Sequence, residues 1–154
     1  MSAPRGYAGA MHAILIRLAG PARARVVMQF MRFGTVGAAG FVVDTSVVYG
    51  LRGAIGLYGA GAVAYLCAAT FTWAFNRIWT FRGPHRHPMH RQWALFLAVN
   101  SVGFVVNRGV FALLVTFSAF CAEYPVVAIF AGMLAGMFLN FAAARKLVFA
   151  GTSS

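Results

Sequence analysis

The chain has 154 residues, of which 61% are hydrophobic and 10% are charged. About a quarter of the residues of soluble domains are charged, so this composition excludes an ordinary soluble protein and indicates one embedded in a membrane. The formal net charge of +11 does not indicate nucleic acid binding, because that function needs a soluble basic face and here long apolar runs take up most of the chain.

The N-terminal segment, residues 1–28, is basic and contains one short apolar stretch, AMHAILIRLAG, from Ala10 to Gly20. Arg17 interrupts this stretch, so it lacks the core of a signal peptide and we expect no cleavage. The stretch and its basic neighbours predict a short helix lying on the inner leaflet of a membrane. A disordered basic tail is the alternative. Either way, residues 1–28 form a separate cytoplasmic segment.

Four apolar stretches follow, with lengths close to the roughly 20 residues that a helix needs to cross a bilayer. They predict an all-α fold, namely a polytopic membrane protein with four transmembrane helices. The stretches span residues 33–51, 57–79, 93–119 and 125–144. The connections RGAIG, CAEY and FRGPHRHPMHRQ are too short to hold a catalytic domain.

Basic residues collect on one side of this predicted bundle. Of the 13 Lys and Arg residues, only Arg52 and Arg108 fall outside the N-terminal region, the middle loop and the C-terminal end. Because Lys and Arg are enriched in cytoplasmic loops, both termini and the middle loop are predicted to be cytoplasmic.

The second half of the chain repeats the first. GFVVDTSVVY, beginning at Gly40, aligns with GFVVNRGVFA, beginning at Gly103. Further along, RIWTFRG, beginning at Arg77, aligns with RKLVFAG, beginning at Arg145, after a short insertion in the second half. The membrane domain, residues 29–149, therefore divides into two repeats. Repeat one spans residues 29–83 and repeat two spans residues 92–151, so repeat two extends into the short C-terminal tail, residues 150–154. Each repeat has two spans, so the repeats are parallel.

Two charged residues, Asp44 and Arg108, lie near the middle of their predicted spans. Such a charge costs about 2.5–3.5 kcal/mol on insertion scales, so it needs a partner, water or a function. The alignment pairs Asp44 with Asn107, which puts Arg108 at nearly the same depth and predicts an ion pair between the repeats. Asn100, Asn107 and Asn140 extend a polar stripe toward the bundle centre, either as a binding path or as hydrogen bonds between helices.

A second group of polar side chains marks the predicted cytoplasmic boundary. Arginine binds phosphate through two parallel hydrogen bonds, so guanidinium groups here would hold a lipid phosphate. Anchoring of the helix ends at the interface is the alternative. The group comprises Asn76, Arg77, Arg145, Lys146 and Arg32.

Neither catalysis nor metal binding is predicted. Asp44 and Glu123 are the only acidic residues and fall at different depths, whereas carboxylates that cleave a glycosidic bond together lie within about 10 Å. His85, His87 and His90 lack metal-ligand spacing and a neighbouring Cys or acid. No G-x-x-x-x-G-K-[ST] loop occurs, which excludes ATP use by this chain. We expect no enzyme activity, no metal and no cofactor.

Several segments together resemble the GtrA-like family of small bacterial membrane proteins. They are FMRFGTVGAAGFVVDTSVVY and FNRIWTF in repeat one, and FLAVNSVGFVVNRGVF and NFAAARKLVF in repeat two. The resemblance covers about residues 29–149 and implies four helices in the bacterial cytoplasmic membrane. It also implies movement of polyprenyl-phosphate-linked sugars for cell-surface polysaccharide synthesis or modification. Repeat two departs from the N-R-x-W-x-F motif, since Ala144 replaces Asn76 and Leu147 replaces Trp79.

Three functions are compatible with these features. The first is translocation of a polyprenyl-phosphate-linked sugar, with the boundary group holding the phosphate and the mid-membrane group contacting the sugar. The second is a non-transporting anchor or accessory subunit that recruits a separate glycosyltransferase, and the third is a small multidrug-type exporter. The expected partners are the lipid-linked sugar, membrane lipids, a separate glycosyltransferase and a second copy in a homodimer, and no nucleic acid.

Overall fold

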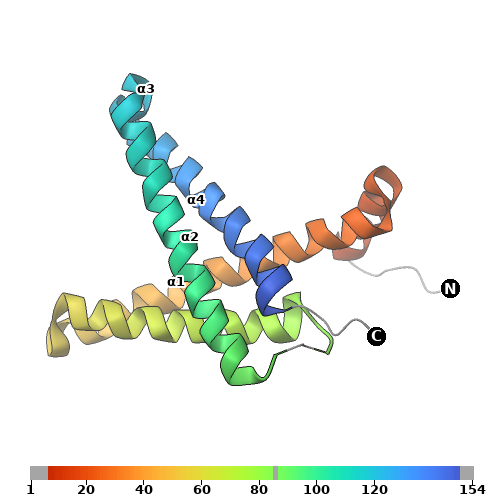
Figure 1. The fold of residues 1–154 in the computed structure, drawn as a ribbon, viewed down its shortest axis with the longest axis horizontal. Coiled ribbons are helices and arrows are strands. Elements are labelled where there is room, and N and C mark those ends of the chain that lie inside the picture. The colour runs from red at the N-terminus through yellow and green to blue at the C-terminus, as the bar shows by residue number, and fades with distance from the viewer. Residues whose placement is uncertain (1–6, 85–86, 150–154) are drawn as a thin grey trace.

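The computed structural model describes the backbone of residues 7–84 and 87–149, and the side chains of residues 20–84 and 87–149. These residues form helices joined by short turns, with no strand in either described range (Figure 1). The elements in chain order are α1 (Tyr7–Phe75), η1 (Asn76–Thr80), α2 (Met89–Phe117), α3 (Ala119–Glu123), α4 (Pro125–Ala143) and η2 (Ala144–Val148). The predicted all-α class is confirmed. His85 and the tail 150–154 lie outside the described residues.

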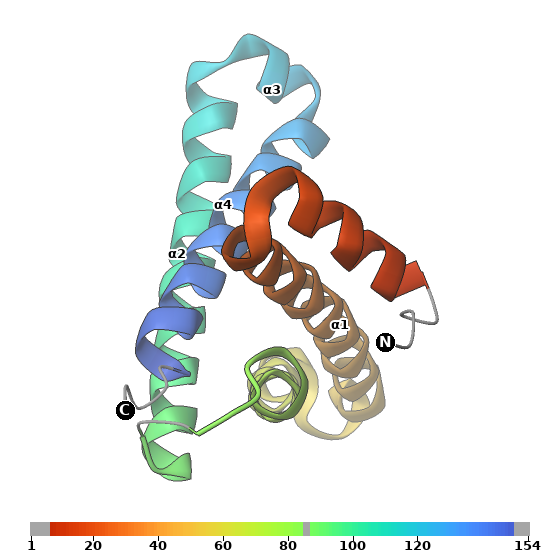
Figure 2. The ribbon, with the colours of Figure 1, turned by 90° about the vertical axis from the view of Figure 1, so that its right-hand side faces the viewer.

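Helix α1 bends sharply at two glycines and so consists of three helical segments. Gly20 has a φ of 78° and Gly56 a φ of 74°, a left-handed conformation that favours glycine because it has no Cβ. The segment 7–19 turns away from the rest of α1 at Gly20, which Pro21 follows (Figure 2). The stretch predicted as an interfacial helix is therefore helical, while its position on a membrane stays a prediction.

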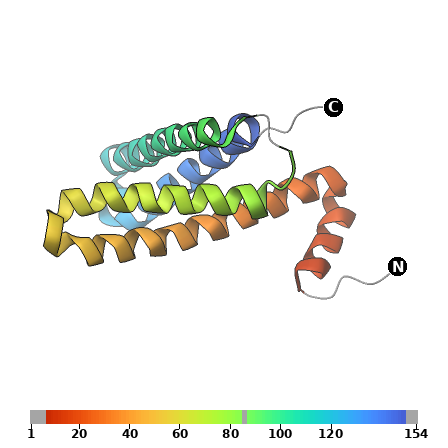
Figure 3. The ribbon, with the colours of Figure 1, turned by 90° about the horizontal axis from the view of Figure 1, so that it is seen from below.

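The chain reverses direction at Gly56, so residues 21–55 and 57–75 run antiparallel and side by side (Figure 3). We call these two arms, together with η1, the first hairpin. Helices α2 and α4, with η2 and the short connecting α3, form the second hairpin (Figure 1). The end of the molecule that carries Arg77, Arg91 and Arg145 is called the basic end, and both hairpins begin and end there.

Three helices among the described residues are long and apolar enough to cross a membrane: Gly20–Thr80, Met89–Phe117 and Pro125–Val148. The first has 61 residues and would rise about 90 Å as one rod, roughly three times the hydrocarbon thickness of a bilayer. Its reversal at Gly56 divides it into two arms of membrane-spanning length. The chain is thus a polytopic helical membrane protein. If each arm crosses the membrane once, the chain has four transmembrane helices, and this number stays a prediction.

The two hairpins contain the same close contact between helices. In the first, Gly40 packs against the side chain of Thr72, and in the second, Gly103 packs against the side chain of Asn140. The sequence alignment of the repeats places Gly103 at the position of Gly40 and Asn140 at the position of Thr72. The structural repeat therefore follows the alignment at both partners of this contact.

Each hairpin ends in a π-helical turn at the same position of the repeat. Phe81 N donates to the Asn76 carbonyl and Phe149 N to the Ala144 carbonyl, both at 2.8 Å. A π turn holds one more residue than an α-helical turn and so changes the direction in which the following residues point. Phe81 and Phe149, the residues that follow η1 and η2, are both buried.

An aromatic cluster at the basic end holds the hairpins together with near two-fold symmetry. The rings of Phe81 and Phe149 stack at a centroid distance of 4.7 Å and an interplanar angle of 14°. Phe33 meets Phe81 at 6.2 Å and 63°, and its repeat equivalent Phe96 meets Phe149 at 5.9 Å and 63°. The pseudo-two-fold axis of the chain therefore passes between Phe81 and Phe149.

Two further contacts join the hairpins at equivalent positions but with different chemistry. Phe30 stacks on Phe138 at 4.8 Å, whereas the indole N–H of Trp93 donates to Thr70 Oγ1 at 3.0 Å. Away from the basic end the hairpins diverge, and the turn at Gly56 lies far from α3 (Figures 1 and 2). The repeats thus share a backbone arrangement, while their polar groups have diverged.

Candidate functional site

A fully buried glutamine connects the hairpins at the basic end. Gln92 Oε1 accepts a hydrogen bond from the guanidinium of Arg77, and Gln92 Nε2 donates to the Val148 carbonyl at 3.2 Å. The end of the first hairpin is thereby linked to both the beginning and the end of the second. Arg77, predicted to hold a phosphate, is engaged in this structural bond.

The repeat equivalent of this glutamine has no such bond. Gln29 Oε1 is buried without a hydrogen-bond partner among the described residues, and so are Asn76 Oδ1 and Thr80 Oγ1 on η1. Repeat two has Ala144 and Val148 at the positions of Asn76 and Thr80. Buried polar atoms normally have a partner, so these three oxygens, like Asn140 Oδ1 in repeat two, lack a hydrogen bond that an enclosed water would supply.

An apolar groove of about 540 Å³ runs along the first hairpin near the basic end. The volume falls within the roughly 300–1,000 Å³ of typical ligand sites. Thr35, Val36 and Ala39 from the first arm form one wall, and the second arm with η1 forms the other. That second wall consists of Phe71, Phe75, Ile78, Trp79 and Arg82.

One guanidinium group, that of Arg82, lines this groove, and a second, that of Arg32, contacts Trp79 of its wall. Arg82 is exposed, and only its Nε is engaged, donating to the Ile78 carbonyl at 3.0 Å. Arg32 donates to the Trp79 carbonyl at 3.4 Å and lies 5.8 Å from the centroid of the Trp79 ring. The two acidic residues of the chain, Asp44 and Glu123, form no salt bridge with either arginine among the described residues. The groove therefore suits an elongated apolar ligand with an anionic end.

The predicted polar stripe in the second hairpin serves the contact between α2 and α4. Asn140 Nδ2 donates to Asn100 Oδ1 at 3.4 Å, and Asn100 Nδ2 donates to the Phe96 carbonyl at 2.8 Å. Asn107 lies against Gly132, where an added Cβ would come within 2.5 Å of the Asn107 carbonyl oxygen. Asn100 and Asn140 are thus brought together, and their bond favours hydrogen bonding between helices over an open path, while Asn107 packs against α4.

The predicted ion pair between Asp44 and Arg108 does not form among the described residues. One residue along an α-helix turns the side chain by about 100°, so Arg108 points away when its neighbour Asn107 faces α4. Arg108 is exposed, and its guanidinium lies 5.5 Å from the ring of Phe104 on the same helix. Asp44 is half-buried at the position equivalent to Asn107. The equal depth of the two charges stays a prediction of the repeat alignment, and the predicted pairing within one chain is not formed.

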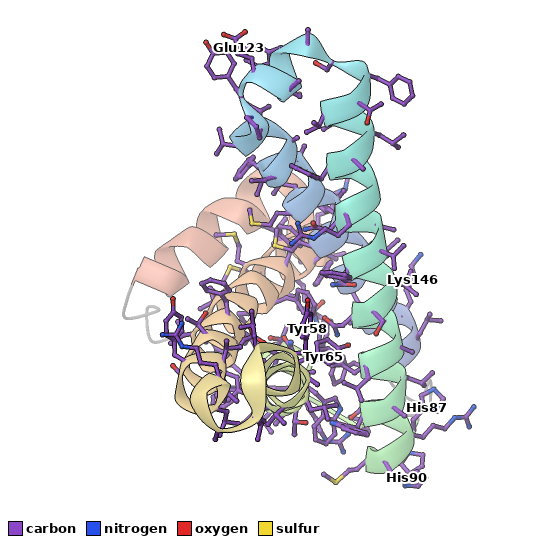
Figure 4. The ribbon with its side chains drawn as sticks, turned by 90° about the vertical axis from the view of Figure 1, so that its left-hand side faces the viewer. Tyr58, Tyr65, His87, His90, Glu123 and Lys146 are labelled. Carbon is purple, nitrogen blue, oxygen red and sulfur yellow. The ribbon has the colours of Figure 1, made fainter. Side chains whose placement is uncertain are left out.

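The remaining predicted site residues, Arg145 and Lys146, are exposed and form no hydrogen bond or ion pair with the described residues. Figure 4 shows Lys146 on the outer side of the second hairpin, with His90 at the basic end and Glu123 at the opposite end. Arg145 does not line the groove, whereas Arg82 does.

The groove and its arginine, Arg82, were not predicted from the sequence. Arg82 was counted there only as a topology signal, and the groove depends on how the two arms of α1 pack side by side, which no local pattern encodes. Gln92 and Gln29 occupy equivalent positions of the two repeats. This equivalence was the one feature of the sequence that pointed to Gln92 as a residue joining the hairpins.

The profile of one protein family, described as GtrA/DPMS, transmembrane domain, matches residues 32–149. The match covers the second hairpin, the first hairpin from residue 32 onward, the groove and the aromatic cluster, and it agrees with the resemblance found in the sequence. No curated protein matches the chain significantly.

Proposed function

The chain belongs to the GtrA/DPMS transmembrane domain family, and on that basis we propose that it moves a polyprenyl-phosphate-linked sugar between the two leaflets of a membrane. Membership links the chain to processes that use polyprenyl-phosphate sugars. The proposal adds translocation itself, a role in cell-surface polysaccharide synthesis or modification, the bacterial inner membrane as location, and the absence of enzyme activity.

The apolar groove that Arg82 lines is the observation that carries this proposal. A polyprenyl chain is long and apolar, and the wall of the groove is mostly apolar, with Phe71, Phe75 and Ile78 on one side. The phosphate would lie against the exposed guanidinium of Arg82, with Arg32 beside it. Guanidinium groups bind phosphate with paired, charge-assisted hydrogen bonds, and no carboxylate of the described residues competes for either arginine.

The sugar would lie next to the polar groups of repeat one. Asn76 Oδ1 and Thr80 Oγ1 are buried acceptors without a partner among the described residues, on the π turn that also carries Trp79 of the groove. Both oxygens are enclosed, since Asn76 is 1% and Thr80 3% exposed, so a sugar hydroxyl would reach them only after η1 moves. This assignment places the sugar at repeat one, which has Asn76 and Thr80 where repeat two has Ala144 and Val148.

The test is a transport assay with the full chain reconstituted in vesicles. An NBD-labelled polyprenyl-phosphate sugar is placed in both leaflets, and dithionite then quenches only the label that reaches the outer leaflet. We expect Arg82→Gln to slow protein-dependent movement about tenfold, because a charge-assisted hydrogen bond is worth about 1.5–3 kcal/mol. Arg91→Gln is the matched control, since Arg91 is exposed at the same end and does not line the groove.

Equal rates for the Arg82→Gln and Arg91→Gln variants would reject the assignment of the groove. Failure of the unaltered chain to move any of several labelled sugars would reject translocation itself. Co-purification of a glycosyltransferase under those conditions would support the anchor function instead.

A further inference from the structure

Two opposite charges in the membrane-spanning part of the chain have no partner among the residues whose side chains the structure describes. Neither Asp44 nor Arg108 forms a hydrogen bond or an ion pair with any described residue, and Arg108 contacts only the ring of Phe104 on its own helix. An unpaired charge is costly in hydrocarbon, so charged residues in membrane spans are paired or face water. Something outside the single chain must therefore meet each of them.

The two charges lie at almost the same depth. Asp44 stands midway along the chain between Arg32 at the basic end and the reversal at Gly56, so it lies at the middle of its arm. The pseudo-two-fold axis relates Asp44 to Asn107, and Arg108 is the next residue, about 1.5 Å further along its helix. Lipid headgroups are about 15 Å away from this depth.

A second copy of the chain meets both requirements at once. A two-fold axis along the membrane normal keeps every residue at its own depth, so only residues of equal depth can pair across it. Such an interface is self-complementary: a contact between residues i and j on one side is repeated as j and i on the other. Asp44 and Arg108 satisfy this condition, and the shared basic end gives both copies the same orientation in the membrane.

We propose that the chain forms a two-fold dimer in which Arg108 of each copy pairs with Asp44 of the other. Arg108 is exposed and long enough to reach out from α2, and Asp44 is half-buried, so part of the residue stays accessible to an arginine of another copy. The dimer then contains two ion pairs and leaves no mid-membrane charge unpaired among the described residues. This proposal does not depend on the transported molecule or on transport itself.

Charge reversal in differently tagged copies provides the test. The full chain is co-expressed with two affinity tags, extracted in mild detergent, and recovered through one tag while the other is quantified. Asp44→Arg in both copies puts two arginines at each contact, and Arg108→Asp in both copies puts two carboxylates there. We expect each variant alone to lower co-purification at least tenfold relative to the unaltered chain.

Mixing the two variants should restore the dimer. When one tagged copy carries Asp44→Arg and the other carries Arg108→Asp, one of the two contacts regains opposite charges with its polarity reversed, and the other returns to the native pair. Arg52→Asp is the matched control, because Arg52 lies on the Tyr49 ring at 4.3 Å near the Gly56 turn, away from the proposed contact. It should leave co-purification unchanged. Rescue only when both reversals are placed in the same copy would show pairing within one chain and overturn the proposal, as would the absence of any rescue.

Chemical cross-linking gives a second readout that does not need a charge-reversed chain to fold. One copy carries Asp44→Cys and the other Arg108→Cys, with Cys67 and Cys121 replaced by alanine. A short bismaleimide should link differently tagged copies into a dimer, whereas two copies that both carry Asp44→Cys should cross-link at least tenfold less. Equal cross-linking of the two mixtures would contradict the proposed contact.

Discussion

Replacing Gly132 by alanine should separate α2 from α4 and destabilise the second hairpin. A Cβ at this position would lie 2.5 Å from the carbonyl oxygen of Asn107, and ordinary contact begins at 3.4 Å. The obstructing atom belongs to the backbone, so no side chain can rotate out of the way. The helices must move apart by 3.4 minus 2.5, or 0.9 Å, and a gap of that size removes roughly a quarter to a half of the dispersion energy of each atom pair it opens.

The expected destabilisation comes from comparison with a second glycine. Overpacking of a close contact costs about 1–3 kcal/mol. Alanine also raises helix propensity by about 1 kcal/mol relative to glycine, which would hide part of the effect. Gly109→Ala on α2 is the matched control, because a Cβ there meets nothing within 4 Å. The propensity gain is the same in both variants, so their difference of about 1–3 kcal/mol reports packing alone.

Thermal unfolding of the full chain in a mild detergent, followed by far-ultraviolet circular dichroism, measures this difference. A chain of this size changes its Tm by about 2–4 °C per kcal/mol, so Gly132→Ala should unfold about 2–12 °C below Gly109→Ala. Identical unfolding temperatures would mean that α2 and α4 do not approach as closely as described.

Two further substitutions test the basic end by the same measurement. Gln92→Leu should lower stability by about 2 kcal/mol or more, because it leaves the Arg77 guanidinium and a buried carbonyl unpaired. Gln29→Leu, at the equivalent position, is the control. It should change stability by no more than about 0.5 kcal/mol, since Gln29 Oε1 has no partner to lose among the described residues. Phe96→Ala should destabilise by about 3 kcal/mol, because Phe96 is 1% exposed within the aromatic cluster, whereas Phe104→Ala, at a residue 60% exposed, should have little effect. Equal losses of stability for Gln92→Leu and Gln29→Leu would contradict the different bonding of the two glutamines. Equal losses for Phe96→Ala and Phe104→Ala would contradict the burial of Phe96 in the aromatic cluster.

The repeat was the most informative part of the sequence. Alignment of the two halves predicted which positions of the hairpins are equivalent, and the contacts of Gly40 with Thr72 and of Gly103 with Asn140 agree with it. Equivalence of position does not give the direction of a neighbouring side chain. The direction predicted for Arg108, toward Asp44 of the same chain, was therefore wrong, and its depth stays a prediction of the alignment.

Contacts between the hairpins could not be read from the sequence. Phe33 and Phe96 were recognised as equivalent, yet periodicity within one helix does not tell which distant rings will meet. The stack of Phe81 on Phe149 depends on the π turns before them, and a single extra residue in a helical turn leaves no mark in a hydrophobic pattern. The groove was missed because it forms between two arms that are separated by a change of direction.

The stack of Phe81 on Phe149 also bears on the origin of the chain. A single hairpin with both ends on one side of the membrane is a complete unit of insertion, and two copies related by a two-fold axis would place one phenylalanine against its own twin. When both copies are encoded in one gene, each half can change its sequence independently of the other. The differences between Asn76 and Ala144 and between Thr45 and Arg108 are of that kind, because two identical copies could not differ at either position.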